Sequence, residues 1–475
     1  MPEVLQPDIC VIGAGSGGLS VAAAAAAFGV PVVLIERGRM GGDCLNYGCV
    51  LSKSLLAAAK QAAAHTQAPA FGVASTPPTI DFVRVREHVR DVIAAIAPND
   101  STQRFTGLGV RVIAGTAQFK DAATVAVGDQ FEIKARRFVI ATGSAPAIPP
   151  IAGLADTPYL TNETIFDLAE CPAHLVVMGA GPVGLELAQA FRRLGAAVTV
   201  LEAATPLGKE DPECAAVVLD RLAREGVVIR AGAAVRRVAG ANGRVQVVVG
   251  GTDNEETIEG SHLLVATGRT PNVADLGLDR AGIKYEPRGL VVDRRLRTTN
   301  KRVYAIGDVA GGLHFTHVAN YHAGLVVRHA LFRLPVRASN DALPRVTFTD
   351  PELAHVGLSE AEARARKYKF QVLRWPYHEN DRAQAERTTE GHIKVITAGN
   401  GRILGATIVG HNAGELISAW SLAVGQRLNI RAMATAVLPY PTLAEIGKRA
   451  AITRYTASLT SPAVRRIIAW LRRLG

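Results

Sequence analysis

"DICVIGAGSGG", residues 8–18, is typical of a buried strand that leads through a glycine-rich turn into an alanine-rich helix. The strand "PVVLIE" at 31–36 follows and ends in Glu36. In a GxGxxG turn the first glycine makes the turn, the second lets the backbone approach a pyrophosphate and the third lets helix and strand pack closely. The helix N-terminus then offers N–H groups and a positive dipole end to the phosphates. These glycine roles fall, in order, on Gly13, Gly15 and Gly18.

The same pattern returns later in the chain. "LVVMGAGPVG" at 175–184 carries the second glycine motif, and "AVTVLE" at 197–202 ends in Glu202. In both copies the acidic residue, which accepts hydrogen bonds from a ribose, stands 23 positions after the first glycine. The three glycines of the second motif are Gly179, Gly181 and Gly184. Two copies in the same strand–turn–helix–strand context are strong evidence where one would be weak.

The repeat extends beyond the glycine motifs. Ala141-Thr142-Gly143-Ser144 follows the strand "RRFVI", and Ala266-Thr267-Gly268-Arg269 follows the strand "SHLLV". We therefore expect two dinucleotide-binding domains, the second running roughly from Tyr159 to Arg269. Two dinucleotides in one chain indicate electron transfer between a flavin and a nicotinamide. Glu202 would repel a 2′-phosphate, and the next two residues are alanines, so NADH is favoured over NADPH.

The composition fits a soluble globular protein, and we expect it to be cytoplasmic. The chain has 475 residues, 48% of them hydrophobic, and an odd count of five cysteines, which is no secreted disulfide framework. The N-terminal stretch has no basic region before an apolar one, so we expect no signal peptide. The net charge is +11, but residues 446–475 alone hold seven Lys/Arg and no Asp/Glu. No basic stripe with aromatic residues remains elsewhere, so we expect no nucleic-acid partner.

"GGDCLNYGCVLSK", residues 41–53, places Cys44 and Cys49 at the start of a predicted helix. Three interpretations of the two cysteines are possible: a redox pair, a metal site or two inert thiols. The spacing lets the sulfurs reach the bonding distance of about 2 Å, and a helix N-terminus lowers the pKa of a thiol. A zinc site needs four ligands, and no second CxxC or histidine pair accompanies these two. The redox pair is favoured, and we expect no metal site.

This segment resembles the redox-active segment of the class I pyridine nucleotide-disulfide oxidoreductases, the flavoprotein disulfide reductases. That family includes dihydrolipoamide dehydrogenase, glutathione reductase and mercuric reductase. "YAIGD" at 304–308 and "PRVTFTDPELAHVGLSEAEA" at 344–363 resemble the family in the same order. The resemblance implies a homodimer and an α/β fold with two Rossmann-like domains and a C-terminal α+β dimerisation domain. The expected boundaries are 1–150 and 271–342 for the FAD domain, 151–270 for the NAD domain, 343–456 for the dimerisation domain and 457–475 for a tail.

Residue roles follow from the resemblance. Cys44 is implied to exchange with substrate and Cys49 to face the flavin, while Lys53 lies beside the flavin and pairs with Glu186. Asp308 is implied to bind the ribityl chain and Thr316 to contact the isoalloxazine. Leu51 stands where relatives usually have proline, so we expect a local change at the helix start. The further implied FAD and NAD contacts, beyond the glycines and acids named above, are Arg37, Gly42, Ala117, Thr142, Gly143, Ser144, Gly268, Arg269 and Gly307.

The chain departs from the disulfide-reducing branch near its C-terminus. That branch has a His-Pro-Thr-x-x-Glu motif whose histidine is the general base and whose glutamate orients it; here Tyr440 replaces the histidine and Glu445 is kept. A tyrosine with a pKa of about 10 cannot shuttle protons at neutral pH as histidine does at about 6.5. The mercuric-reductase branch also places tyrosine there, yet it ends in a cysteine pair that this chain lacks. Three other histidines are weaker candidates for the base, more typical of structural or surface positions: His378, His392 and His411.

The resulting hypothesis is an FAD-dependent oxidoreductase that passes electrons from NADH through FAD to Cys44–Cys49 and on to a disulfide or thiol substrate. The alternative is reduction of a metal ion or reactive oxidant, as in mercuric reductase. A second alternative is a slow redox-sensing flavoprotein with a membrane-binding tail.

The tail sequence "SPAVRRIIAWLRRLG" predicts a short helix with Ser461 as N-cap and Pro462 as first residue. Its apolar residues fall on one face and its four arginines largely around the rest. Such a helix could pack on the body or the dimer partner, and we favour this interpretation. The alternative is peripheral contact with an anionic membrane through residues 457–475.

Overall fold

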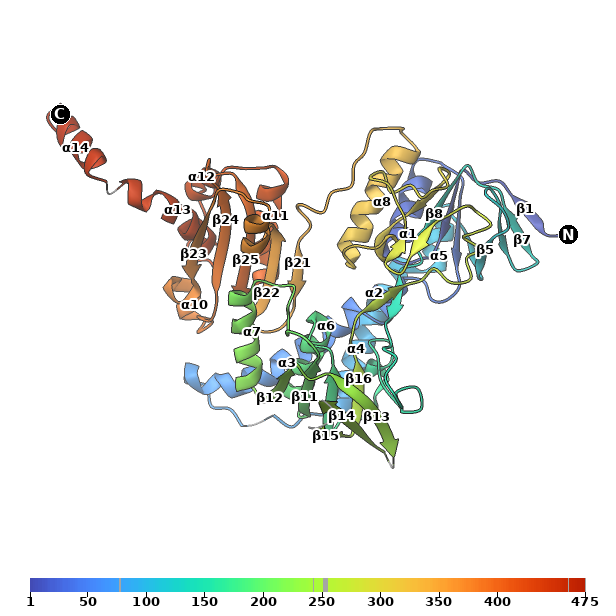
Figure 1. Ribbon diagram of the computed structural model, residues 1–475, viewed down its shortest axis with the longest axis horizontal. Helices are drawn as coiled ribbons and strands as arrows, with labels where there is room; N and C mark the ends of the chain where they lie inside the picture. The colour runs from blue at the N-terminus through green and yellow to red at the C-terminus, as the bar shows by residue number, and fades with distance from the viewer. Residues whose placement is uncertain (77, 242, 251–254, 460, 475) are drawn as a thin grey trace. The chain divides into compact units, whose positions relative to one another are not determined.

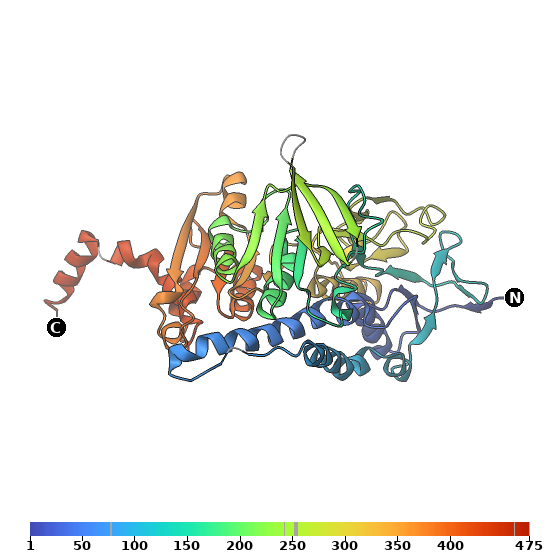
Figure 2. The same cartoon turned by 90° about the horizontal axis from the view of Figure 1, so that it is seen from below.

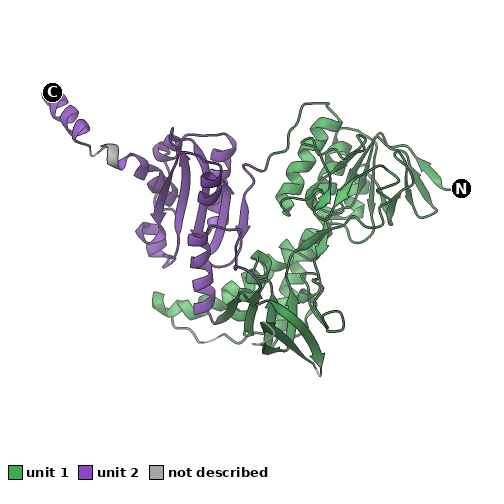
Figure 3. Cartoon of the chain, viewed as in Figure 1, with its two compact units in different colours: residues 1–203, 227–339 green, residues 204–226, 340–475 purple. Residues whose placement is uncertain are grey.

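The computed structural model describes residues 1–76, 78–241, 243–250, 255–459 and 461–474. The chain forms two compact units (Figure 3). The first unit holds residues 1–203 and 227–339, and the second holds residues 204–226 and 340–475. Both expected dinucleotide sheets lie in the first unit and the antiparallel sheet of the C-terminal region in the second, which confirms the predicted α/β fold class.

The first dinucleotide sheet is all parallel, in the order β20-β8-β2-β3-β4. Helices α1 (Ser16–Ala27) and α8 (Thr316–Ala330) pack against each other beside it (Figure 1). The central strand is buried throughout, which explains its unbroken apolar sequence. Its edge strand β20 pairs with β8 and comes from the part of the chain that follows the second glycine motif. The strands are β2 (Ile9–Ile12), β3 (Val32–Glu36), β4 (Arg111–Ala114), β8 (Arg137–Ile140) and β20 (Val303–Ala305).

The second dinucleotide sheet is also parallel, in the order β12-β11-β10-β16. Helix α6 (Pro182–Arg193) follows its glycine turn and packs on β10 and β11. An antiparallel three-stranded sheet, β13-β14-β15, is formed between β12 and β16 in the chain. The strands are β10 (His174–Met178), β11 (Ala197–Glu202), β12 (Val227–Ala231), β13 (Val235–Ala241), β14 (Arg244–Gly250), β15 (Glu255–Gly260) and β16 (His262–Val265).

The cysteine segment forms two consecutive helices. Short helix α2 (Gly42–Asn46) carries Cys44, and the long helix α3 (Cys49–Gln67) begins at Cys49, as predicted (Figure 2, blue). Leu51 lies buried in the first turn of α3. A proline is also tolerated in that turn, so both residue types fit the position, and the local change at the helix start stays a prediction.

The second unit is built on one antiparallel sheet, β21-β22-β25-β24-β23. Helix α11 packs on β22 and β25, and α13 packs on β23 and β24. The strands are β21 (Arg345–Thr347), β22 (Glu352–Gly357), β23 (Phe370–Pro376), β24 (His392–Ala398) and β25 (Ile403–Gly410); the helices are α9 (Glu360–Ala365), α10 (Asp381–Ala385), α11 (Ala413–Gly425), α12 (Ile430–Thr435), α13 (Glu445–Leu459) and α14 (Pro462–Leu471).

Helix α7 (Pro212–Arg224) belongs to this second unit, although the sequence places it between two strands of the NAD sheet. The reason is a buried ion cluster: Lys394 Nζ on β24 lies 2.8 Å from Asp211, 2.9 Å from Glu360 and 3.1 Å from Glu213. Lys394 is 4% exposed, so these carboxylates are what makes its burial tolerable. The N-terminus of α7 is thereby fixed to the antiparallel sheet.

The remaining elements are short except for α4, which has 15 residues. They are α4 (Phe82–Ile96), α5 (Thr102–Gly107), β1 (Glu3–Leu5), β5 (Ala117–Phe119), β6 (Val125–Val127), β7 (Phe131–Ile133), β9 (Ser144–Pro146), β17 (Arg269–Pro271), β18 (Tyr285–Glu286), β19 (Gly289–Leu290) and the 3₁₀ turns η1 (Ala68–Phe71), η2 (Ala97–Asp100), η3 (Ile165–Asp167), η4 (Gly307–Ala310) and η5 (Tyr377–Glu379). Among the described residues, every helix is too short or too polar to cross a membrane.

Candidate active site

The first glycine turn excludes side chains by direct contact. Gly13 has φ of +103°, and a Cβ there would lie 2.4 Å from the carbonyl oxygen of Ala141. A Cβ on Gly18 would lie 1.9 Å from the carbonyl oxygen of Gly13. The amide of Ala14 donates a 2.6 Å hydrogen bond to Glu36 Oε2. The expected strand–turn–helix geometry is therefore present, with the carboxylate of Glu36 at the turn.

The second turn repeats these contacts. Gly179 has φ of +107°, and its Cβ would lie 2.4 Å from the carbonyl oxygen of Ala266. A Cβ on Gly184 would lie 2.0 Å from the carbonyl oxygen of Gly179, and the Ala180 amide donates to Glu202 Oε2 at 2.8 Å. Glu36 and Glu202 thus each accept a hydrogen bond from the amide of the residue after the first glycine of their turn. This shared contact explains why both copies have the same spacing between glycine and acid.

The helices behind the two turns begin without a side-chain cap. The N-caps are Gly15 for α1 and Gly181 for α6, and neither helix has an acidic residue in its first turn. The N–H groups of an uncapped helix start need acceptors, and a phosphate supplies them. Both turns fit the pyrophosphate of a dinucleotide.

The two cysteines of the redox segment come together. Cys44 and Cys49 are hydrogen-bonded to each other, and Thr316 Oγ1 at the start of α8 lies 3.6 Å from Cys49 Sγ. The hydrogen bond from Cys44 lowers the pKa of Cys49 to about 6, and Thr316 and the cation of Lys53 act in the same direction against the cost of burial. The pKa of Cys44 is raised by the same bond and by burial. Cys49 is therefore the thiolate of the pair at neutral pH.

The other three thiols lack these stabilising contacts. Burial raises the pKa of Cys10, Cys171 and Cys214 above the ordinary value for cysteine. They stay protonated at neutral pH and are not nucleophiles. Reactivity is thus concentrated in the Cys44–Cys49 pair.

Lys53 pairs with Glu186 as the resemblance implied. Lys53 Nζ lies 2.8 Å from Glu186 Oε2, and the carboxylate residue is only 4% exposed. Lys53 stands one turn after Cys49 on α3, whereas Glu186 lies in α6 behind the second glycine turn. The ion pair therefore joins the helix of the redox pair to the helix of the second dinucleotide motif.

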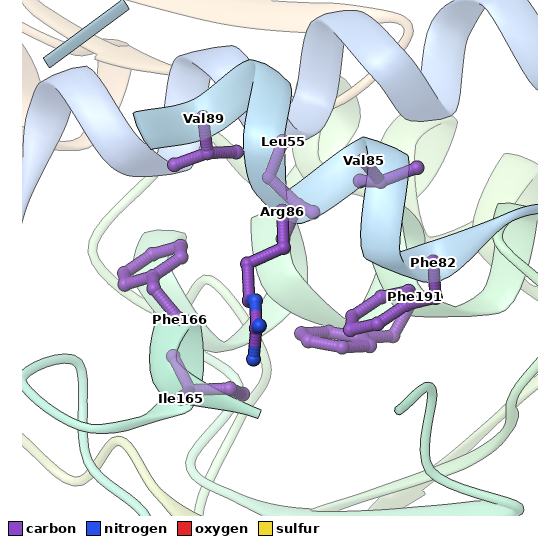
Figure 4. A pocket seen from close by; sticks show the side chains of 8 residues that line it. All are labelled: Leu55, Phe82, Val85, Arg86, Val89, Ile165, Phe166 and Phe191. Carbon is purple, nitrogen blue, oxygen red and sulfur yellow. The ribbon is translucent and has the colours of Figure 1, made fainter. Parts of the chain in front are cut away.

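Apolar packing supports this junction. Phe82 on α4 and Phe191 on α6 stand with ring centroids 6.1 Å apart, and Leu55 of α3 lines the same pocket (Figure 4). The pocket has a volume of about 10 Å³, room for about one water molecule, so it is a packing defect and no substrate site. The apolar side chains around it pack α3 against α4 and α6.

A polar network surrounds the expected ribityl-binding residue Asp308. Ser144 Oγ donates to Asp308 Oδ2 at 2.5 Å, and Arg269 Nε donates to Ser144 Oγ at 2.7 Å. Arg269 also forms a 3.2 Å ion pair with Asp43, the residue before Cys44. Asn162 donates to the carbonyl of Tyr47 at 3.1 Å. No motif pointed to Asp43 or Asn162, and both position the redox segment through contacts with residues distant in the chain.

The other residues expected to contact a cofactor differ in burial, hydrogen bonding and backbone conformation. Gly42 faces the first glycine turn, since its Cβ would lie 2.6 Å from the Cα of Gly15. Thr142 donates to the carbonyl of Asn272 at 2.8 Å. Gly143, Gly268 and Gly307 have positive φ of +68°, +134° and +67°. Arg37 is exposed, whereas Ala117 is buried in β5; their cofactor roles stay predictions.

Tyr440 is not held by the residue that the family motif suggests. Its hydroxyl donates a 2.7 Å hydrogen bond to Asp381 Oδ2, and this bond raises the pKa of Tyr440, with the charge of Glu445 adding to it. The phenol is 69% exposed and stays protonated at neutral pH. Of the histidines considered as substitutes, His392 lies 3.5 Å from Cys214 and 3.4 Å from Glu213, a structural setting. No cluster of metal-ligating side chains occurs among the residues described.

The low pKa of Cys49 predicts a specific pH profile. In the reduced, FAD-loaded protein, the rate of Cys49 alkylation by iodoacetamide should rise through a midpoint near pH 6, because the thiolate is the nucleophile. Replacing Cys44→Ala removes the main stabilising hydrogen bond and should move that midpoint toward the ordinary value, with Thr316→Ala giving a smaller shift in the same direction. Peptide mass spectrometry at each pH measures the rate. A wild-type midpoint near pH 9, unmoved in either variant, contradicts this account.

Comparison with known proteins agrees with this geometry. Residues 7–323 match the family described as pyridine nucleotide-disulphide oxidoreductase, and residues 343–451 match its dimerisation domain, which supports a homodimer. The chain is 37% identical to a mercuric reductase from Streptomyces lividans and 34% identical to a dihydrolipoyl dehydrogenase from Geobacillus stearothermophilus, each over 94% of this chain and 96% of the relative.

A solved structure has the same fold. The Cu(II) complex of the HOCl-induced flavoprotein disulfide reductase RclA from Escherichia coli has a TM-score of 0.83 and 30% identity, covering 93% of this chain and 98% of that one. The family implies FAD and NAD(P)H as cofactors. The chain belongs to the pyridine nucleotide-disulphide oxidoreductase family, as a flavoprotein disulfide reductase.

Proposed function

We propose that the protein carries electrons from NADH through FAD to the Cys44–Cys49 pair, and from this pair to a thiophilic metal ion. When bound, FAD would supply a two-electron carrier between the nicotinamide and the sulfurs. The chain's own part is to hold phosphates at the two glycine turns, to keep Cys49 as a thiolate and to place the cation of Lys53 beside it. The observation that favours a metal ion as acceptor is the state of Tyr440.

Proton balance distinguishes the acceptors. Reducing a disulfide consumes NADH, one proton and the disulfide and yields NAD⁺ and two thiols, so a group at the site must deliver protons to the leaving sulfurs. Reducing one Hg(II) ion to the element, or two Cu(II) ions to Cu(I), consumes one NADH and yields NAD⁺, one proton and the reduced metal. Tyr440 keeps its proton in the bond to Asp381 at neutral pH. Tyr440, which stands at the family's general-base position, therefore does not shuttle protons at neutral pH as a histidine would, and this supports a metal ion, whose reduction needs no proton delivery.

Soft metal ions also suit the sulfur pair. Cysteine thiolates bind soft cations such as Hg(II) and Cu(I) in preference to oxygen-seeking ions. The relatives include a mercuric reductase, and the similar RclA structure is a Cu(II) complex. This chain has no cysteine after Cys214, so we propose that the ion reaches Cys44 and Cys49 directly.

Small disulfides are the second candidate. The sequence put this substrate first, and the dihydrolipoyl dehydrogenase from Geobacillus stearothermophilus is nearly as similar as the mercuric reductase. The reactive pair itself suits exchange through a mixed disulfide. We further propose a cytoplasmic homodimer in which the partner's Tyr440 completes each site.

An acceptor assay tests the proposal. Under anaerobic conditions the FAD-loaded enzyme should oxidise NADH with Hg(II) or Cu(II) at an ordinary enzymatic rate, roughly 1–10³ per second, and with lipoamide far more slowly. The Tyr440→His variant should gain lipoamide turnover of roughly 10²-fold, because a general acid–base contributes about that factor or more.

Tyr368→His is the matched control, since Tyr368 is also exposed and lies in the same unit. It should leave both rates unchanged. Fast lipoamide turnover by the wild type would overturn the metal-ion assignment in favour of the disulfide. Rapid flavin reduction with slow turnover on every acceptor would instead favour a redox sensor.

The NADH preference rests on Glu202. Replacing Glu202→Gln removes the charge that repels a 2′-phosphate but keeps an oxygen that can accept from the Ala180 amide. The ratio of kcat/KM for NADPH to that for NADH should rise roughly tenfold, the effect of about 1.4 kcal/mol of relieved repulsion. Steady-state rates with each nucleotide, at equal FAD content, measure this. An unchanged ratio would show that Glu202 does not select the nucleotide.

A further inference from the structure

The C-terminal helix α14 (Pro462–Leu471) exposes large apolar side chains. Ser461 caps it by accepting a 3.3 Å hydrogen bond from the amide of Val464, as predicted. Among the described residues 461–474, the exposed apolar side chains are Ile467 at 56%, Ile468 at 50%, Trp470 at 59%, Leu471 at 49% and Leu474 at 69%. The expectation that this face packs on the chain's own body is not borne out.

The helix separates apolar from charged side chains. With 3.6 residues per turn, Val464, Ile468 and Leu471 fall on one line along the helix, with Ile467 and Trp470 beside them on one side. The arginines occupy the opposite arc; they are Arg465, Arg466, Arg472 and Arg473. Residues 446–475 contain no Asp or Glu, so nothing in this stretch neutralises those four charges.

The tail is also not part of the family's dimerisation domain. The match to that domain ends at residue 451, ahead of α14. The helix therefore lies outside the segment that matches the family's dimerisation domain. Two subunits would carry two copies of it.

We propose that α14 binds the surface of an anionic lipid bilayer. A ten-residue helix is about 15 Å long, half of the hydrocarbon thickness, so it is too short to span a bilayer. It would lie in the interface with its apolar face toward the hydrocarbon. Trp470 suits the interfacial region, and the arginines pair with lipid phosphates. A nucleic acid would satisfy the arginines but leave the apolar face in water. In a homodimer, binding of one tail would hold the second tail close to the same membrane, so the dimer would bind more tightly than one tail alone.

The test is sedimentation of the full-length FAD-loaded protein with vesicles of equal parts phosphatidylglycerol and phosphatidylcholine. The wild type should bind these vesicles, bind pure phosphatidylcholine far less and be released by about 0.5 M salt, where charges are screened beyond roughly 4 Å. Trp470 emission should shift to the blue on binding, a shift absent in Trp470→Phe. NADH turnover should not change, so this outcome is independent of the acceptor.

Paired variants separate the two faces of the helix. Arg465→Gln with Arg466→Gln should weaken binding roughly 25-fold, about 5-fold for each charge near an anionic surface. The control Arg366→Gln with Lys367→Gln removes two exposed charges elsewhere in the same unit and should not change binding. Ile467→Ser with Leu471→Ser should abolish binding to both vesicle types.

Two results would overturn the proposal. One is equal sedimentation of the wild type and of a chain lacking residues 461–475. The other is a change of oligomer size when α14 is deleted, which would assign the apolar face to a second copy of the chain.

Discussion

The two glycine turns of the first unit depend on backbone contacts that are too close to leave room for a side chain. Gly13 and Gly179 bring the backbone so close to the carbonyls of Ala141 and Ala266 that a Cβ would lie 2.4 Å from either oxygen. This approach lets each helix start directly at the end of its strand, with its N–H groups uncapped. The capacity to bind a dinucleotide phosphate follows from that exclusion of side chains.

The redox pair depends on the same frame. Gly42 packs against Gly15 of the first turn, which fixes the start of the cysteine segment, and Lys53 reaches Glu186 in the helix of the second turn. Since Glu186 is buried, replacing the lysine would remove an ion pair from this carboxylate in the protein interior. Cys49 thus lies on a helix tied to both dinucleotide motifs, and the thiolate form is stabilised there by Cys44 and Thr316.

Much of this arrangement was predictable because the chemistry demands residue types at fixed spacing. The glycines and the acids Glu36 and Glu202 were identified from motifs, and the Lys53–Glu186 pair was implied by the family resemblance. Asp381, the hydrogen-bond partner of Tyr440, was not identified, because it lies 59 positions earlier in the chain and belongs to no motif. Lys394 was missed for another reason: a lysine in the strand "HIKVITA" is ordinarily a solvent-facing residue, and only the fold brings three carboxylates to it. Long-range polar partners leave little trace in a single sequence.

The central claim is that electrons from the nicotinamide reach the Cys44–Cys49 pair. The direct measurement is anaerobic: one equivalent of NADH is added to the oxidised, FAD-loaded enzyme, flavin absorbance is recorded, and free thiols are counted after acid quenching. The account predicts a flavin that returns largely to the oxidised state and two new thiols per subunit, with neither result in Cys49→Ser. A flavin that stays reduced in the wild type, with no new thiols, would contradict it.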